Sequence, residues 1–182
     1  VIVPIAAKKE GVTEACRALR DRLAAAGIRV VLDESENSPG WKFNEWEMKG
    51  VPVRIELGPR DLEAGKCMMA RRDTHEKGEY ALEGAVGSVR ALLDDIAENM
   101  YNTAKARMDS RIVRAESLEA LLAGVDGGNF VRAGWCGCRA CEDKVKEFAQ
   151  ATARVMDEEN TSATCVVCGK KAERTVIFAR AY

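Results

Sequence analysis

The segments GWCGCRAC (residues 134–141) and CVVC (residues 165–168) hold five of the seven cysteines in the chain, and they decide how its C-terminal part folds. Structural Zn²⁺ sites take four thiolate or imidazole ligands at the corners of a tetrahedron, and two short cysteine turns bring four sulfurs together with little strain. A closed shell of four cysteines leaves no open position for water, so its role is structural rather than catalytic. We therefore expect this part of the chain to fold around a zinc ion.

The spacing of the cysteines leaves open which four of the five bind the metal. Cys138 and Cys141 have the common two-residue spacing, whereas Cys136 and Cys141 have a looser four-residue spacing, so spacing alone slightly favours Cys138. Two disulfides are the competing interpretation. The N-terminus does not resemble a signal peptide, and close pairs with a long gap are typical of metal sites in a reducing compartment. The sequence thus favours zinc and a cytoplasmic location.

Composition describes an ordinary soluble protein. The 182 residues are 47% hydrophobic and 31% charged, enough for one large domain or two small ones, and no stretch approaches the roughly 20 apolar residues of a membrane helix. The formal net charge of −1 excludes a bulk polycation, so any nucleic-acid binding needs a local patch of basic residues.

Two cysteines outside the close pairs, Cys16 and Cys67, have apolar sequence neighbours, which is typical of buried core residues. His75, the only histidine, lies in a polar run, which argues against a histidine-based catalytic triad.

Alternating strands and helices predict an α/β fold in two domains. In the first part the expected strands are residues 1–6, 28–34, 51–58 and 65–72, and the expected helices are 10–26, 41–50 and 84–107. In the second part we expect helices at 117–124 and 141–150 and strands at 129–133 and 174–182. The basic stretch KARMDSRIVR joins the two parts, which gives domains at 1–107 and 108–182.

The segment SPGWKFNEWEMKGVPVRIELGPRDL (residues 38–62) is the densest mixture of aromatic and charged residues in the chain. On a helix, Trp41 and Met48 fall on one side while Phe43 and Trp46 fall on the other. Carboxylates beside basic groups suit single-stranded RNA, because an unpaired guanine offers N1–H and N2–H to a carboxylate and O6 to a cation. Without further information, the segment favours an aromatic core with solvated charges over an RNA-binding surface.

The same segment resembles the anticodon-binding domain of prolyl-tRNA synthetases, and WCG (135–137), CVVCGK (165–170) and the final FARAY resemble the C-terminal zinc domain of that family. The likeness runs over most of the chain and is to the archaeal and eukaryotic type of this class II enzyme, which some bacteria also carry. It implies a mixed five-stranded sheet flanked by helices that recognises the two guanines shared by proline anticodons. A small zinc-stabilised α/β domain follows.

The resemblance also implies individual site residues. Glu47 and Arg54 match RNA-reading positions in NEWEMKGVPVR, Asp61 matches one in GPRDL, and Lys77 matches a lysine that follows the arginine pair. In the family, the first cysteine follows the aromatic residue of the WCG turn and the second comes five positions later. The implied metal ligands are therefore Cys136, Cys141, Cys165 and Cys168, with Cys138 left as a spare thiol.

For the whole enzyme, the resemblance implies ATP-dependent joining of proline to its tRNA. The class II core that would bind ATP and Mg²⁺ has no counterpart in these residues, so we expect the fragment to be inactive alone. Its expected partners are proline tRNA, its own catalytic domain, toward which the carboxylate of Tyr182 would turn, and a second subunit in a homodimer; no membrane is expected.

Three other interpretations remain open at this point. The chain could be a free-standing RNA-binding or regulatory protein that lost the synthetase core. It could belong to a class II synthetase for threonine, histidine or glycine, whose anticodon domains share the α/β layer. The zinc unit could instead be a protein-docking module in a molecule that binds no RNA.

Overall fold

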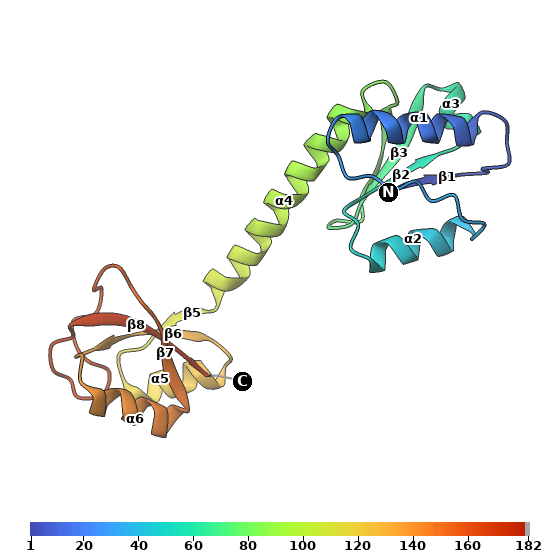
Figure 1. Ribbon diagram of the computed structural model, residues 1–182. Helices are drawn as coiled ribbons and strands as arrows, with labels where there is room; N and C mark the ends of the chain where they lie inside the picture. The colour runs from blue at the N-terminus through green and yellow to red at the C-terminus, as the bar shows by residue number, and fades with distance from the viewer. Residues whose placement is uncertain (181–182) are drawn as a thin grey trace. The chain divides into compact units, whose positions relative to one another are not determined.

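The computed structural model describes residues 1–180, so the expectation for Tyr182 lies outside the described residues. The chain divides into two compact units, Val1–Asn102 and a second unit that starts at Thr103. The division falls inside one continuous helix, α4 (Ala85–Ser110), and the expected domain boundary after residue 107 lies in the same helix (Figure 1). Among the helices described, none combines the length and the apolar character needed to cross a lipid bilayer.

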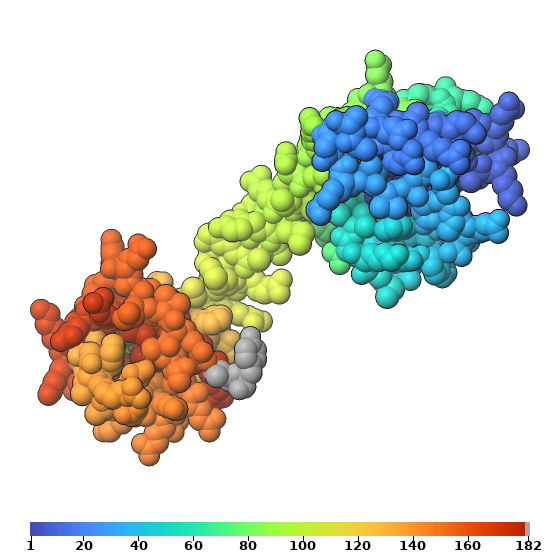
Figure 2. All heavy atoms as spheres, viewed as in Figure 1, coloured from blue at the N-terminus to red at the C-terminus, as the bar shows by residue number. Residues whose placement is uncertain are grey.

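The first unit is built on a mixed sheet with the strand order β1-β2-β3-β4. β1 runs parallel to β2, and the following pairs are antiparallel. Helices α1 and α2 lie on opposite sides of this sheet (Figure 1), and side chains of both reach the surface that faces the viewer in Figure 2. In chain order the elements before α4 are β1 (Ile2–Pro4), α1 (Val12–Ala25), α2 (Pro39–Met48), β2 (Val53–Leu57), α3 (Pro59–Glu63), β3 (Lys66–Arg71) and β4 (Lys77–Ala81).

The predicted α/β class is confirmed, but the first sheet has four strands rather than the five expected. Residues 28–34 form only an isolated parallel bridge, between Leu32 and Ile2. The chain turns away after this bridge because the Asp33 carboxylate accepts hydrogen bonds from the N–H of Ser35 at 3.0 Å and from its hydroxyl at 2.6 Å. A side chain that closes a local turn competes with continued strand pairing.

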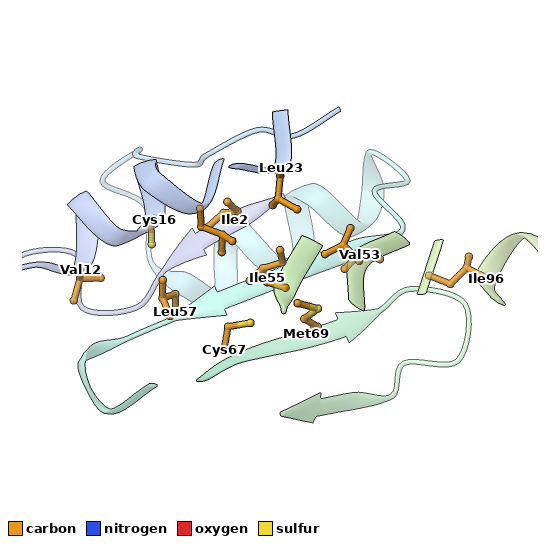
Figure 3. Packing of buried hydrophobic residues seen from close by; sticks show 13 residues of the cluster. Ile2, Val12, Cys16, Leu23, Val53, Ile55, Leu57, Cys67, Met69 and Ile96 are labelled. Carbon is orange, nitrogen blue, oxygen red and sulfur yellow. The ribbon is translucent and has the colours of Figure 1, made fainter. Parts of the chain in front are cut away.

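The core of the first unit lies between the sheet and the helices α1 and α4 (Figure 3). Helix α1 buries Val12, Cys16, Leu19 and Leu23, whose spacing of three to four residues places them on one face. Cys16 and Cys67 are fully buried, as predicted, and burial raises the pKa of each thiol to about 11. Both therefore act as small apolar residues rather than as nucleophiles.

The second unit has its own mixed sheet, in the order β5-β6-β8-β7. β5 runs parallel to β6, and the other pairs are antiparallel. The helices α5 and α6 lie together on one side of the sheet (Figure 1), and the Ser117 hydroxyl caps α5 by accepting the Ala120 N–H at 3.1 Å. The elements are β5 (Ile112–Arg114), α5 (Leu118–Asp126), β6 (Phe130–Trp135), α6 (Arg139–Ala149), β7 (Ala151–Met156) and β8 (Arg174–Arg180).

Candidate metal centre and nucleic-acid interface

Four cysteine side chains meet at one point in the second unit. The Sγ atoms of Cys136, Cys141, Cys165 and Cys168 all lie within 4.8 Å of one another. The Cys136 sulfur is 3.6 Å from that of Cys141 and 3.7 Å from that of Cys168. Sulfurs about 2.3 Å from a tetrahedral zinc ion are about 3.8 Å apart, whereas a disulfide would need about 2.05 Å. The donor set therefore fits a zinc ion and not a pair of disulfides.

Backbone contacts hold the second cysteine turn against β6. The Gly169 N–H donates to the Cys165 carbonyl at 2.9 Å, and Gly169 has a φ of 69°, which a glycine adopts without strain. The Val166 N–H donates to the Gly134 carbonyl at 2.9 Å. A Cβ on Gly134 would lie 2.1 Å from the Thr164 carbonyl oxygen, so only glycine permits this close approach. The two cysteine turns are thereby fixed relative to each other.

Cys138 lies outside the cluster, although its spacing slightly favoured it. Its side chain is exposed, and the residue is the N-cap of α6. Its carbonyl accepts hydrogen bonds from the indole N–H of Trp135 at 3.1 Å and from the N–H of Cys141 at 3.1 Å. The described structure therefore brings together the four cysteines that the family resemblance implied, with Cys136 rather than Cys138 as the first.

The environment of the four thiols is asymmetric. Burial raises the pKa of Cys141 far above that of an ordinary thiol. Burial would also raise the pKa of Cys165, but hydrogen bonds from the N–H groups of Cys168 and Val167 outweigh it and lower this pKa to about 7. Backbone donors aimed at a sulfur stabilise the thiolate, which is the form that binds metal.

The first unit has a pocket of about 170 Å³ between α2, β2 and the turn that joins β3 to β4. Glu47 and Arg54 both line it, and its wall also includes Phe43, Trp46, Arg72 and His75. The Glu47 side chain is 45% exposed, and its Oε1 atom lies 3.4 Å from Nδ1 of His75. His75 has a φ of 60°, an uncommon conformation for a residue other than glycine. The carboxylate-bearing residue Glu47 and the guanidinium-bearing residue Arg54 therefore line the same small pocket.

A buried carboxylate positions the two basic candidates, Arg54 and Lys77. Arg54 Nε donates to Glu56 Oε1 at 3.1 Å, and Lys77 Nζ lies 2.5 Å from Glu56 Oε2. The strand register places Arg54 opposite Ala70 and Ala70 opposite Lys77, so the two basic residues occupy one row of the sheet. The Arg54 guanidinium also lies 3.9 Å from the centre of the Phe43 ring. Glu56 and Phe43 thus restrict the directions in which these cations can point.

Asp61 has a different setting from the other RNA-binding candidates. It lies in the first turn of α3, and its Oδ2 atom accepts the Gly58 N–H at 2.8 Å. It is not among the residues that line the pocket of Glu47 and Arg54. The structure therefore gives Asp61 a helix-capping contact. Lys77 also lies outside the lining of this pocket, but Glu56 connects it to Arg54.

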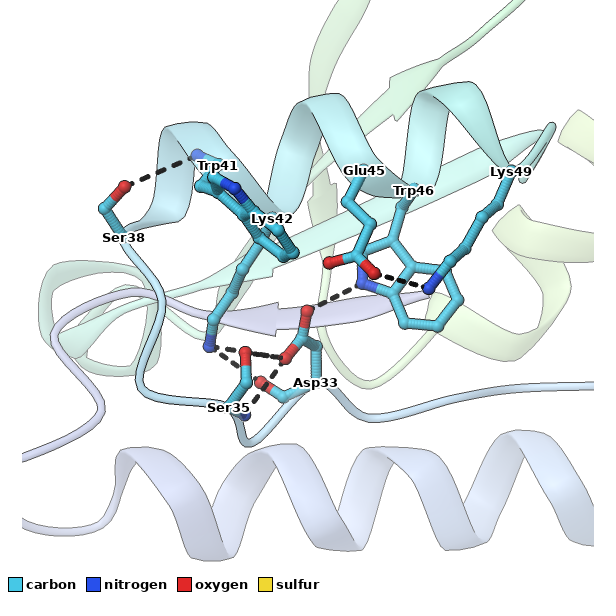
Figure 4. Close-up of polar contacts among 8 residues, drawn as sticks. All are labelled: Asp33, Ser35, Ser38, Trp41, Lys42, Glu45, Trp46 and Lys49. Carbon is cyan, nitrogen blue, oxygen red and sulfur yellow. Dashed lines mark hydrogen bonds and ion pairs between the residues drawn. The ribbon is translucent and has the colours of Figure 1, made fainter.

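A buried polar network that sequence reasoning missed anchors α2 (Figure 4). Lys42 is only 3% exposed; its Nζ atom donates to the Asp33 carbonyl at 3.0 Å and lies 3.6 Å from Oδ1 of that residue. The indole N–H of Trp46 donates to Asp33 Oδ2 at 2.7 Å. Burial would raise the pKa of Asp33, but hydrogen bonds from Ser35 and Trp46 and the charge of Lys42 together lower it. The network fixes the helix that carries Glu47.

A second ionic cluster holds the turn beside the pocket. Arg71 donates through two guanidinium nitrogens to Asp73, at 2.9 and 2.7 Å, and also pairs with Asp95 on α4. Asn99 Nδ2 donates to Asp73 at 2.7 Å. Hydrogen bonding from Arg71 is the main cause that holds the pKa of Asp73 well below its usual range.

This cluster predicts an acid-sensitive first unit. Because the folded pKa of Asp73 is depressed, its contribution to stability is complete above the ordinary pKa of 3.8 and declines as the pH falls below it. The urea midpoint of the first unit should therefore stay nearly constant above about pH 4 and drop as the pH falls from there toward about 2. In Asp73→Asn, the midpoint should be lower at about pH 5 and should change less with pH. An equally steep decline in that variant would show that other groups control it.

Two family models match the chain: "Anticodon binding domain" over residues 1–92, and "Prolyl-tRNA synthetase, C-terminal" over residues 118–182. The curated relatives include proteins named "Proline–tRNA ligase" from Clostridium botulinum (strain Langeland), Alkaliphilus oremlandii and Oceanobacillus iheyensis, which are 44%, 45% and 42% identical to it. Each match covers 100% of this chain but 38% of the relative. These matches favour a synthetase over a free-standing RNA-binding protein. The chain belongs to the prolyl-tRNA synthetase family, in which it corresponds to an anticodon-binding domain followed by the C-terminal domain.

Proposed function

We propose that this chain is the tRNA-selecting part of an enzyme that joins proline to its tRNA in an ATP-dependent reaction. The pocket that combines Glu47 with Arg54 carries this proposal, because it offers a carboxylate and a guanidinium to one unpaired base. The relatives named proline–tRNA ligase support the same activity for the longer protein. ATP and Mg²⁺ would act in the catalytic domain, not in these residues, so this chain alone would not aminoacylate tRNA.

In this proposal the pocket recognises guanine by its edges. The Glu47 carboxylate accepts hydrogen bonds from the N1–H and N2–H groups of a splayed guanine, which adenine does not present in the same pattern. Arg54 donates to a base acceptor such as O6, and its stacking on Phe43 holds its plane in one orientation. Lys77, tied to Glu56, supplies positive charge for an adjacent phosphate or base acceptor. Asp61, which also accepts the Gly58 N–H, would contact the RNA at a separate position of the same domain.

The four-cysteine cluster would hold Zn²⁺ and supply rigidity rather than catalysis. With Cys136, Cys141, Cys165 and Cys168 as ligands, the shell has no open position for a reacting group. The stabilised domain would then brace the chain against its own catalytic domain, in a homodimeric enzyme of the archaeal and eukaryotic type. All seven cysteines are unpaired, which fits the reducing environment of the cytoplasm.

The proposed function predicts a guanine preference that depends on Glu47. We expect the chain to bind an anticodon stem-loop with the two proline guanines about 10- to 100-fold more tightly than the same loop with adenines, since a good base contact contributes about 1–3 kcal/mol. Glu47→Ala should remove most of this preference. The measurement is a fluorescence titration of both loops at fixed low salt, because phosphate contacts make the affinity depend on salt.

A matched control lies on the same helix. Glu45 pairs with Lys49 on the surface of α2 and does not line the pocket, so Glu45→Ala should keep the guanine preference. Equal affinity for the two loops in the unmodified chain would contradict the proposed reading of guanine. Binding that weakens little with added salt would instead favour a protein-docking role.

A further inference from the structure

A second pocket, of about 280 Å³, lies wholly within the second unit and has no role in the proposed function. Its lining includes Arg114 at the end of β5, Arg132 on β6, and three loop residues that have hydroxyl side chains, Thr161, Ser162 and Thr164. All of these groups can donate hydrogen bonds. The pocket is therefore lined by donors from a sheet face and from the loop that precedes the second cysteine turn.

The two arginines are neighbours in the sheet. β5 and β6 are parallel, and the register pairs Arg114 with Arg132, so both side chains leave the same face of the sheet. Like charges on directly paired strand positions destabilise a sheet unless a counter-charge lies between them. Of these two arginines, only Arg132 has a partner among the described carboxylates: Asp157, whose Oδ2 atom lies 2.9 Å from Nε. That buried Nε nevertheless lacks hydrogen-bond geometry with any described acceptor.

Arg114 is more exposed and makes one weaker contact. Its Nη2 atom donates to the Thr161 hydroxyl at 3.3 Å, and no described carboxylate lies within ion-pair distance of it. Glu116 lines the same pocket without pairing with either arginine. Two guanidinium groups and one carboxylate, that of Glu116, therefore line the pocket, and the carboxylate that pairs with Arg132, Asp157, lies outside the lining.

The hydroxyl side of the pocket is fixed in place by Thr175, a fully buried residue of β8. Its Oγ1 atom accepts the Thr161 N–H at 2.8 Å and lies 3.0 Å from both Asn160 Oδ1 and Ser162 Oγ. The loop is also held at its far end, where Thr164 packs against Gly134. A donor set that is ordered before a ligand arrives loses little entropy on binding.

We propose that this pocket binds a phosphate group, with Arg114 and Arg132 on one side and the loop hydroxyls on the other. Guanidinium groups match the oxygens of phosphate in pairs, and a tetrahedral anion can meet donors from two sides at once, which a planar carboxylate does less well. The phosphate can come from an RNA backbone or from a free phosphate compound. The first source rests on the proposed tRNA-binding function, whereas the second does not.

Inorganic phosphate tests the site without any RNA. We expect titration of the full chain to give saturable shifts of the Nε–H NMR signals of Arg114 and Arg132, and chloride or acetate at equal ionic strength should not reproduce them. Arg114→Gln should weaken phosphate binding at least tenfold. Arg154→Gln, an exposed arginine on β7 that does not line the pocket, should leave the binding unchanged.

Two results would overturn the proposal: phosphate shifts that equal those of chloride, or identical phosphate affinity in the unmodified chain and Arg114→Gln. Thr161→Val gives an independent check, because it removes a pocket hydroxyl while both arginines remain. A titration of proline tRNA then identifies the source. Weaker tRNA binding by Arg114→Gln, with the guanine preference intact, assigns the site to the RNA backbone; unchanged tRNA binding assigns it to a free phosphate. Loss of the guanine preference in Glu47→Ala tests the other site separately.

Discussion

Replacing Cys141 with serine is expected to abolish tight zinc binding and to unfold the second unit, while the first unit keeps its fold. Cys141 is 7% exposed and lies in the first turn of α6, so its sulfur belongs both to the proposed metal shell and to the packed interior. Structural zinc contributes about 10–16 kcal/mol of apparent binding energy in small domains, which equals or exceeds the net stability of about 5–15 kcal/mol typical of a protein. Loss of the ion therefore removes most of the folding energy available to this unit.

Elemental analysis of the purified chain and its ¹H–¹⁵N NMR spectrum measure the two effects together. We expect one zinc per unmodified chain and dispersed signals from both units; in Cys141→Ser the signals of residues in the second unit should collapse into the unfolded region. Cys138→Ser is the matched control, because this exposed thiol lies outside the cluster, and it should retain its zinc. A folded, zinc-loaded Cys141→Ser chain would disprove the assigned ligand set. Zinc loss in Cys138→Ser would contradict the choice of Cys136.

Asp33→Asn is expected to destabilise the first unit by about 3–5 kcal/mol, the usual cost of removing one partner from a buried charge pair. The substitution keeps the size of the side chain but removes the negative charge that faces Lys42, whose side chain is 4% exposed. It also exchanges one of the two acceptor oxygens that serve Ser35 and Trp46 for a donor. A charged ammonium group would then remain buried without a counter-charge.

Urea unfolding followed by NMR signals of β2 would measure this loss in the first unit alone. The double variant Asp33→Asn with Lys42→Met should recover much of the stability, because it removes both buried charges rather than one. Glu45→Gln is the surface control: its pair with Lys49 is exposed, so we expect a change of about 0.5 kcal/mol or less. If Asp33→Asn matched this small change, the buried network would not be the anchor of α2.

Local sequence signals predicted the elements that have a strong pattern of their own. The spacing of Val12, Leu19 and Leu23 gives α1 its buried face, and the close cysteine pairs indicated a metal cluster in the second unit. In contrast, the sequence predicts no strand at β4 (Lys77–Ala81), because KGEYA lacks a continuous apolar or β-branched run. Its strand structure depends on pairing with β3, a partner that the local sequence does not reveal.

The candidate pocket was only partly predictable for the same reason. Glu47 and Arg54 could be selected from one continuous segment, and the structure places both in one pocket. The role of Glu56 could not be predicted in this way, because its contact with Lys77 depends on the register of three strands. Lys42 reads as a solvated lysine on a helix, and only the fold brings Asp33 beneath it. The contacts of the site that depend on pairing between distant segments therefore could not be predicted from the local sequence pattern.

The parallel pairing of β1 with β2 has a consequence for the order in which the first unit assembles. Ile2 lies opposite Ile55, so this contact closes a loop of about fifty residues, whereas β2, β3 and β4 follow one another through short connections. Contacts between residues distant in sequence carry a larger entropic barrier and slow folding. We therefore expect the β2-β3-β4 meander to form first, with the docking of β1 as the slow step that completes the sheet.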